Sequence, residues 1–245
     1  MKYTARTDIG QKRENNEDFL FAKIYDDNTA LFVVADGLGG YSSGEVASQM
    51  AVNSIKDNFE LNLDVLRASD EEKIKQFFKQ LIIVTNDKVF DVQKSNKKYN
   101  GMGTTITLVG KVNNKLYYES VGDSRLYYID ANKENIEQVT VDDTYVNELL
   151  KKKLIKKSEV ENHPQKHMLT KAIGIFNKID TQVDILEKDK GYLILTTDGL
   201  TNMLTNEDIL QTVRLNRFLA LSDIFVDAAN RNGGTDNITV IVVEI

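Results

Sequence analysis

The spacing of the strand-like segments in the middle of the chain is the feature that most constrains its fold. Apolar residues alternate over residues 104–112, 115–123 and 125–132, and only short turns bearing Asn or Gly separate these segments. Parallel strands would need crossovers of about a dozen residues or more, and this stretch has no room for them. The spacing therefore predicts an antiparallel meander. Further strands are predicted over 3–10, 18–25, 30–37, 181–186, 191–199 and 237–245.

Two long helices are predicted between the N-terminal strands and this meander. Apolar residues recur at helical spacing from Ser43 to Phe59 and from Glu71 to about Gln93, so each helix is expected to bury one face. Two further helices are predicted over 206–213 and 218–230. This order of strands and paired helices predicts an α+β fold, in which antiparallel sheets carry helices on their outer faces.

The composition indicates one soluble domain over residues 1–245. The chain has a single proline, no low-complexity linker and no internal repeat. Its net charge of −6 argues against general nucleic-acid binding. No apolar stretch approaches the roughly 18 residues of a membrane span, and the N-terminus lacks the apolar core of a signal peptide. We expect a cytoplasmic monomer with no membrane or nucleic-acid partner.

The residue inventory narrows the chemistry. The chain has no cysteine, which removes disulfides, thiolate zinc sites and a cysteine nucleophile. It has two histidines, His163 and His167, which we interpret as ordinary surface or packing residues. The chemistry is therefore expected to depend on carboxylates, arginine and metal ions that prefer oxygen ligands.

Acidic residues stand at the ends of five predicted strands, most of them near a glycine. They are Glu17 with Asp18, Asp36, Asp123, Asp198 and Asp236. Each alone is more typical of a turn. If the strand ends converge at one edge, however, these carboxylates would repel one another unless cations neutralised them. Such a group would suit Mg²⁺ or Mn²⁺, and Arg13 is a candidate to hold a phosphate, although any single arginine is more often a surface residue.

Seven short motifs occur in an order that resembles the metal-dependent protein serine/threonine phosphatases of the PPM or PP2C family. They are RENNED, VVADGLGG, GMGTTIT, VGDSRLY, LTKAIG, LTTDGL and GGTDNITVIVV. The resemblance runs from about Thr7 to Val243 and is closest in character to small bacterial members that oppose serine/threonine kinases. It implies a four-layer α-β-β-α sandwich, with two antiparallel sheets flanked by helix pairs.

The resemblance also implies a centre of two metal ions. By position in the motifs, Asp36 would bridge both ions and the carbonyl of Gly37 would bind the second. Asp198 and Asp236 would complete the protein ligands of the first ion. Gly39 and Gly40 would let the backbone bend tightly beside the site.

Four other residues match supporting positions of the family. Glu17 and Asp18 correspond to the acidic pair that supports the second ion, directly or through water. Asp123 corresponds to the residue that, with Asp198, forms a third metal site in bacterial relatives. Arg13 corresponds to the arginine that holds the substrate phosphate. The implied cofactors are two to three Mn²⁺ or Mg²⁺ ions.

The implied activity is hydrolysis of phosphoserine and phosphothreonine on proteins by a water that bridges two metal ions, with no phosphoenzyme. The implied partners are phosphoprotein substrates and a cognate serine/threonine kinase. Two alternatives remain: a metal-dependent hydrolase of small phosphate esters, and a silent family member with a regulatory role. The presence of Asp36, Asp198 and Asp236 favours an active enzyme, because silent relatives tend to have lost these residues.

The sequence departs from its relatives at two places. Leu38 stands where animal relatives carry a histidine proposed as the general acid, so the proton donor is unassigned, and a water is the simplest choice. Asp142, Asp143 and Thr144 stand where bacterial relatives usually have Asp-His-Ser. This junction leads into the segment that resembles the family's mobile flap, and it leaves the substrate preference open.

The flap is expected to span about residues 145–168. It contains five lysines: Lys151, Lys152, Lys153, Lys156 and Lys157. They form either a solvated charged face or a surface that gathers acidic phosphoproteins by electrostatic attraction.

Overall fold

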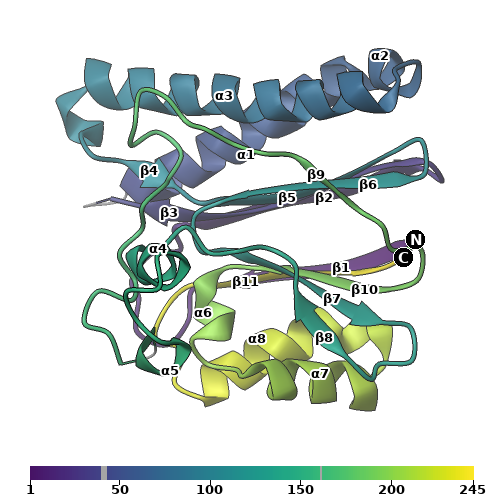
Figure 1. Ribbon diagram of the computed structural model, residues 1–245, viewed down its shortest axis with the longest axis vertical. Coiled ribbons are helices and arrows are strands. Elements are labelled where there is room, and N and C mark those ends of the chain that lie inside the picture. The colour runs from purple at the N-terminus through teal and green to yellow at the C-terminus, as the bar shows by residue number, and fades with distance from the viewer. Residues whose placement is uncertain (40–42, 161) are drawn as a thin grey trace.

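The structure, a computed structural model, describes residues 1–39, 43–160 and 162–245, and it contains two antiparallel sheets packed face to face (Figure 1). The first sheet has the strand order β1-β11-β10-β7-β8. Its strands are β1 Lys2–Asp8, β7 Arg125–Asp130, β8 Ile136–Gln138, β10 Gly191–Thr196 and β11 Ile238–Glu244. The second has the order β2-β3-β5-β6-β9, and β4 pairs with the end of β3. Its strands are β2 Asp18–Asp26, β3 Thr29–Leu38, β4 Gly103–Thr104, β5 Ile106–Val112, β6 Lys115–Val121 and β9 Asp184–Leu186.

Helices cover the outer face of each sheet, which confirms the predicted four-layer α-β-β-α sandwich (Figure 1). One face carries α1 Ser43–Leu61, α2 Leu63–Arg67 and α3 Glu71–Ser95, followed by the short 3₁₀ helix η1 Lys97–Tyr99. The opposite face carries α7 Asn206–Leu215, η2 Phe218–Ala220 and α8 Leu221–Arg231. Three short helices, α4 Tyr145–Lys151, α5 Lys157–Val160 and α6 Asp198–Thr201, lie toward one end of the sandwich.

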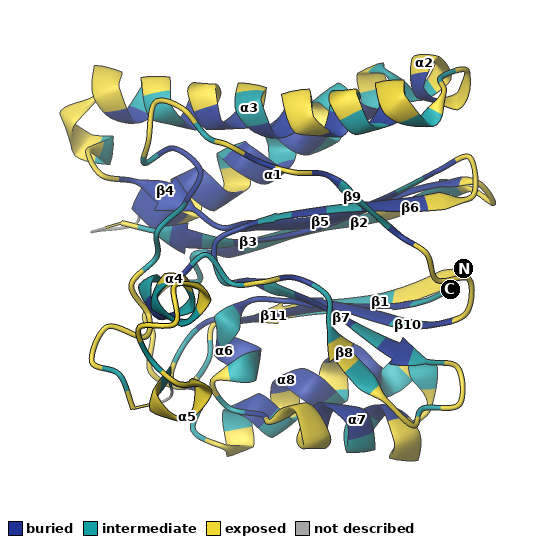
Figure 2. Ribbon diagram, viewed as in Figure 1, coloured by how far each residue is buried: buried dark blue, intermediate teal, exposed yellow. Residues whose placement is uncertain are grey.

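The apolar runs of the central strands are long because both of their faces are buried. In β3, the side chains of Leu31, Val33 and Ala35 pack in the cluster under α1 and α3. The alternate residues Phe32 and Val34 pack between the two sheets. The whole inner part of β3 is therefore buried (Figure 2). Strand β11 does the same with the cluster under α7 and α8 on its other side.

The strand ends differ from the prediction in detail. Strand β3 does not end at Asp36 but continues to Leu38, because Gly37 and Leu38 pair with the two residues of β4. Asp198 lies in the first turn of α6 rather than at the end of β10. The strand predicted over 104–112 is divided at Thr105, and neither α2 nor β8 was predicted. The long helices and the helices over 206–213 and 218–230 are confirmed within a few residues.

Strand pairing brings the acidic strand ends to one end of the sandwich. Asp18 lies directly opposite Asp36 across β2 and β3. Arg125, two residues after Asp123, lies opposite Thr196, two residues before Asp198. Residue Gly40, expected to shape the nearby turn with Gly39, lies outside the described residues, whereas Gly39 adopts a φ of 149°, which favours glycine.

Candidate metal and phosphate site

The acidic side chains at this end of the sandwich form one cluster, which we call the acid cluster: Glu17, Asp18, Asp36, Asp123, Asp198 and Asp236. Asp18 and Asp36 lie at its centre. Asp18 is 5% exposed, and its Oδ2 accepts a hydrogen bond of 2.8 Å from Thr197 Oγ1. Its Oδ1 is buried and finds no partner among the described residues. Burial raises the pKa of Asp18 to about 7, and the charges of Asp198 and Asp236 act in the same direction. An acid held in this way favours any ligand that brings positive charge.

The backbone of Asp36 is fixed by the segment between β4 and β5. Its N–H donates to Thr105 Oγ1 at 2.9 Å, and its carbonyl accepts from the Thr105 N–H and the Thr104 hydroxyl, both at 2.8 Å. Burial raises the pKa of the Asp36 carboxyl well above its usual value. Four neighbouring acids raise it further, in decreasing order Asp18, Asp198, Asp123 and Asp236. The side chain is thus held among other strand-end carboxylates, whose charges act on it.

Gly37 is needed because the chain crosses the start of α1 closely here. A Cβ at Gly37 would lie 2.2 Å from the Gly44 carbonyl oxygen and 2.6 Å from that of Glu17. A Cβ at Gly44 would in turn lie 2.7 Å from Glu17 Oε2. The two glycines let β3, β2 and α1 meet beside the acids, with Glu17 at this contact.

Asp198, just after β10 of the first sheet, and Asp123, in the link from β6 to β7, lie near these acids. Asp198 Oδ2 accepts from Asn202 Nδ2 at 3.0 Å, while its buried Oδ1 has no donor in the described part of the chain. Burial, followed by the charge of Asp236, raises the pKa of Asp198. Burial also raises the pKa of Asp123 to about 7, with Asp198 and Asp142 adding to the effect. Both sheets therefore contribute acids to one group.

Arg13 forms an ion pair with Asp236. Arg13 Nη2 lies 2.7 Å from Asp236 Oδ2, and the arginine side chain is 52% exposed. The loop that carries Arg13 is held by Asn237, whose Nδ2 donates to the carbonyls of Ile9 and Asn15, both at 2.9 Å. An exposed ion pair of this kind contributes at most about 1 kcal/mol, so either partner can exchange it for another charged group at little cost.

These donors fit a cation that prefers oxygen ligands. These side chains are mostly carboxylates, with Arg13 beside them, and oxygens of Asp18 and Asp198 lack a partner among the described residues. Over residues 1–39, 43–160 and 162–245, no three acidic or histidine side chains already converge as a metal cage. The residues that would hold Mg²⁺ or Mn²⁺ are thus close together without being preformed around one point.

Comparison with known proteins assigns the family. The family model for protein phosphatase 2C matches residues 9–236. The chain belongs to the protein phosphatase 2C family. It is 34% identical over 248 residues to protein phosphatase PhpP of Streptococcus pneumoniae serotype 2 (strain D39 / NCTC 7466), covering all of this chain and 98% of the relative. It is 35% identical over 241 residues to serine/threonine phosphatase stp of Listeria welshimeri, covering 98% and 94%.

Solved structures of bacterial PP2C phosphatases share the fold. The serine/threonine phosphatase of S. agalactiae superposes with a TM-score of 0.87 at 32% identity, covering 98% of both chains. The catalytic domain of the phosphatase PstP in complex with two manganese ions superposes with a TM-score of 0.82 at 27% identity, covering 98% of this chain and 96% of that one. The expected family and fold are confirmed.

Asp142, which matches the family's Asp, together with Asp143 and Thr144, which depart from it, fixes the start of the segment predicted as the flap. We call these three residues the neck. Asp142 forms a bidentate pair with Arg125, whose Nη2 lies 2.7 Å from its Oδ2 and whose Nε lies 3.0 Å from both oxygens. Asp143 exchanges hydrogen bonds with Gly122, since its N–H donates to the Gly122 carbonyl at 2.8 Å and its Oδ2 accepts at 3.2 Å. These residues anchor the flap.

Thr144 completes the neck. It caps α4 by accepting from the Asn147 N–H at 3.4 Å, and it forms a β-bridge with Leu169. The segment predicted as the flap, residues 145–168, therefore starts and ends where Thr144 and Leu169 pair, next to the contact of Asp143 with Gly122. The sequence indicated this junction but not the pairing of Asp142 with Arg125.

The flap lysines are exposed and differ in their surroundings. Lys152 pairs with Glu148 of the same helix at 3.3 Å, and Lys153 adopts a φ of 58° just after α4. Lys151 borders a cavity on the α3 side of the molecule. Lys156 and Lys157 lie at the start of α5.

His167 is exposed, in agreement with its interpretation as a surface residue. It lies near enough to Asp198 that its charge acts to lower the pKa of that carboxyl, against the larger effect of burial. His163 instead packs against the ring of Tyr145, with ring centroids 6.1 Å apart. No sequence signal separates these two histidines, because their difference depends on how the flap folds back.

Proposed function

We propose that this chain is a Mg²⁺- or Mn²⁺-dependent phosphatase that releases phosphate from phosphoserine and phosphothreonine on proteins and opposes a bacterial serine/threonine kinase. The main support for this proposal is the acid cluster at one end of the sandwich, with Arg13 beside it. The relatives named as serine/threonine phosphatases and the manganese-bound relative support it. No helix in the described part of the chain is long and apolar enough to cross a membrane.

The proposed ligand set is that of the motifs. Asp36, the Gly37 carbonyl, Asp198 and Asp236 would hold two ions, and Asp123 with Asp198 would hold a third. Bound metal would supply an activated water nucleophile and neutralise charge on the phosphoryl group. Glu17 and Asp18 would support the ions directly or through water, and the hydroxyl of Thr197 orients Asp18.

Arg13 would bind the equatorial oxygens of the substrate phosphate. Its guanidinium offers two parallel N–H donors, which a phosphate accepts better than a single carboxylate oxygen does. Its present partner is Asp236, at a part-exposed contact that is readily exchanged. Direct attack by water on phosphorus needs no covalent phosphoenzyme, and the absence of cysteine from the chain fits such a mechanism.

Manganese-dependent hydrolysis of an aryl phosphate by the wild type, lost in Asp236→Asn, tests the active enzyme against a silent regulatory member. Asp189→Asn is the matched control, since Asp189 is exposed and lies outside the group. Faster release from a phosphothreonine peptide than from sugar phosphates supports a protein substrate. Equal or faster release from sugar phosphates would instead favour a hydrolase of small esters.

A further inference from the structure

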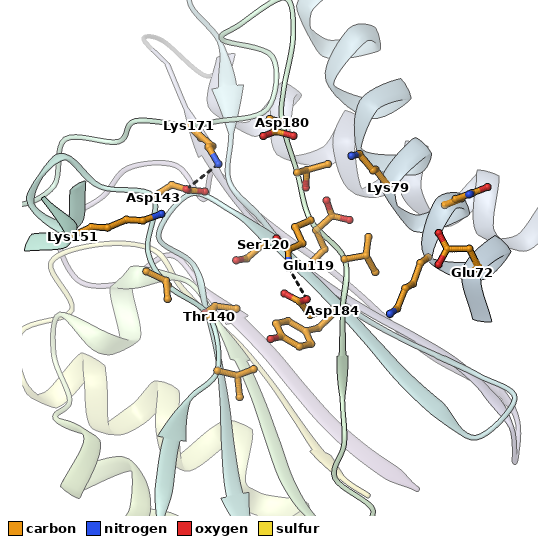
Figure 3. A pocket seen from close by; sticks show the side chains of 18 residues that line it. Glu72, Lys79, Glu119, Ser120, Thr140, Asp143, Lys151, Lys171, Asp180 and Asp184 are labelled. Carbon is orange, nitrogen blue, oxygen red and sulfur yellow. Dashed lines mark hydrogen bonds and ion pairs between the residues drawn. The ribbon is translucent and has the colours of Figure 1, made fainter. Parts of the chain in front are cut away.

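A cavity that Asp36 does not line lies on the α3 side of the molecule. It has a volume of about 760 Å³, and its walls come from α3, β6, the turn before Asp143 and the segment leading into β9 (Figure 3). This size lies within the range of ligand-binding cavities. Among its lining residues, Lys171 alone belongs to one of the seven family motifs, LTKAIG.

The floor of the cavity holds a buried acid in a position that should be apolar. Alternation along β6 points Tyr117, Glu119 and Val121 to the same face, under α3. Tyr117 and Val121 join the apolar core there. Glu119 is 1% exposed, and neither carboxylate oxygen has a hydrogen-bond partner in the described structure. The buried hydroxyl of Thr181, which also lines the cavity, lacks a partner as well.

An unpartnered buried carboxylate is costly and calls for an explanation. Burial raises the pKa of Glu119 to about 8; the charge of Lys79 opposes this shift and that of Asp184 adds to it. Lys79 points from α3 toward the middle of the cavity, but it makes no ion pair with Glu119 within the described residues (Figure 3). The acid is thus placed where a ligand could satisfy it.

The charges around the cavity favour a cation. Two of the lining lysines already have acidic partners, since Lys75 lies 3.3 Å from Glu71 and Lys171 lies 3.5 Å from Asp143. The remaining lining charges, which make no ion pair in the described ranges, are the acids Glu72, Glu119, Asp180 and Asp184 and the lysines Lys79 and Lys151. Acids therefore exceed bases, and a group with several N–H donors would pair with Glu119.

One end of the cavity adjoins the acid cluster around Asp36. Asp143 lines the cavity, and it exchanges two hydrogen bonds with Gly122, the residue before Asp123. Lys151 of the flap lines the same end. A peptide whose phosphate lies at the acid cluster would thus have a neighbouring cavity to extend into.

We propose that this cavity binds an arginine or lysine side chain of the phosphoprotein substrate, with Glu119 as the partner of its charged group. The proposal rests on the function proposed above. It assigns to Glu119 a role in choosing substrates by the residues that flank the phosphorylated one. A guanidinium fits best, because its two parallel N–H groups match both unpartnered oxygens.

The test compares phosphothreonine peptides that differ only in arginine or citrulline at one position, scanned along both sides of the phosphothreonine. Citrulline keeps the shape of arginine and removes its charge. For the manganese-loaded wild type, we expect kcat/KM to favour arginine about tenfold or more at one or two positions. In Glu119→Gln this ratio should fall to within about twofold, while Glu187→Gln, a change at an exposed acid outside the cavity, should keep it.

The readout is a ratio within one preparation, so partial loss of folded protein does not change it. A second variant, Lys79→Met, removes the competing cation and should raise the preference for arginine. An unchanged ratio in both variants, or no arginine preference at any position, would overturn the proposal. So would stabilisation of the wild type by agmatine without any peptide preference, because the cavity would then bind a free cation.

Failure of the underlying function has a different signature. If the wild type hydrolyses neither the aryl phosphate nor any peptide, the phosphatase assignment is wrong. If it hydrolyses them with no regard to arginine, only the role of Glu119 is wrong.

Discussion

Two groups of buried acids lie side by side and have opposite environments. At the neck of the flap, Asp142 has a 9% exposed side chain and a bidentate arginine partner. In the neighbouring acid cluster, Asp36 and Asp18 are surrounded by other acids, and burial and like charge raise their pKa values. The first arrangement satisfies its buried charges without further ligands, whereas the second destabilises the fold until positive charge arrives. The difference separates an anchor from a binding site.

Substituting an acid of the acid cluster should lower phosphatase activity without lowering the stability of the metal-free protein. We expect Asp36→Asn to lower manganese-dependent hydrolysis of an aryl phosphate by about a thousandfold or more, since the acid would touch both ions. Without metal, the variant should melt at a higher temperature than the wild type, because one repelling charge is gone. Activity assays and thermal melts in chelator check both parts. A lower melting temperature without metal would contradict the comparison.

Substituting within the paired group should have the reverse effect. Asp142→Asn leaves Arg125 without its carboxylate, and we expect a loss of about 2–4 kcal/mol in the free energy of unfolding, somewhat reduced because Arg125 is partly exposed. Urea denaturation measures this free energy of unfolding. Asp189→Asn serves as the exposed control, and an Asp142 variant as stable as that control would show that the pair of Asp142 with Arg125 does not anchor the fold.

The pH dependence of stability should show the same contrast. The pKa values of Asp18 and Asp123 are raised to about 7, so the metal-free folded state binds more protons than the unfolded state between pH 4 and 7. Their contribution is therefore fully present near pH 4 and is lost as the pH rises through 7, by an amount on the order of a few kcal/mol.

Denaturation of metal-free protein from pH 5 to 8 measures this loss. Asp18→Asn should flatten the profile, and saturating Mn²⁺ should reverse the trend by favouring the ionised acids. A metal-free stability that increases steadily with pH would count against the raised pKa values.

The smallest expected effect concerns the flap. Changing Lys152, Lys153, Lys156 and Lys157 to Gln, and leaving Lys151 at the cavity, should reduce kcat/KM on an acidic phosphoprotein by about two- to fivefold at low salt. Hydrolysis of a small aryl phosphate should not change, and the effect should vanish at high ionic strength. Equal rates on the phosphoprotein at low salt would leave these lysines as a solvated face.

The sequence predicted those features that depend on local pattern. The apolar run from Ala30 to Asp36 indicated a strand, and the short turns between 104 and 132 excluded parallel crossovers. The family resemblance named the acids that the strand register then brings together, such as Asp18 opposite Asp36. Local spacing and motif order were sufficient for these features because each is encoded within a few residues.

Features that depend on distant contacts were not predictable in the same way. The pairing of Arg13 with Asp236 joins residues 223 apart, and β4 extends β3 only because the chain returns to it after α3. The place of Glu119 could be read from the alternation in β6, but its lack of a partner depends on where α3 and the segment before β9 lie. Such contacts arise from tertiary packing.

Calorimetric titration of Mn²⁺ into metal-free protein measures whether Asp36 and its neighbouring acids form the metal site. We predict that the wild type binds at least two ions per chain, that Asp36→Asn loses this binding, and that Asp189→Asn retains it. Equal Mn²⁺ binding by Asp36→Asn and the wild type would contradict the account.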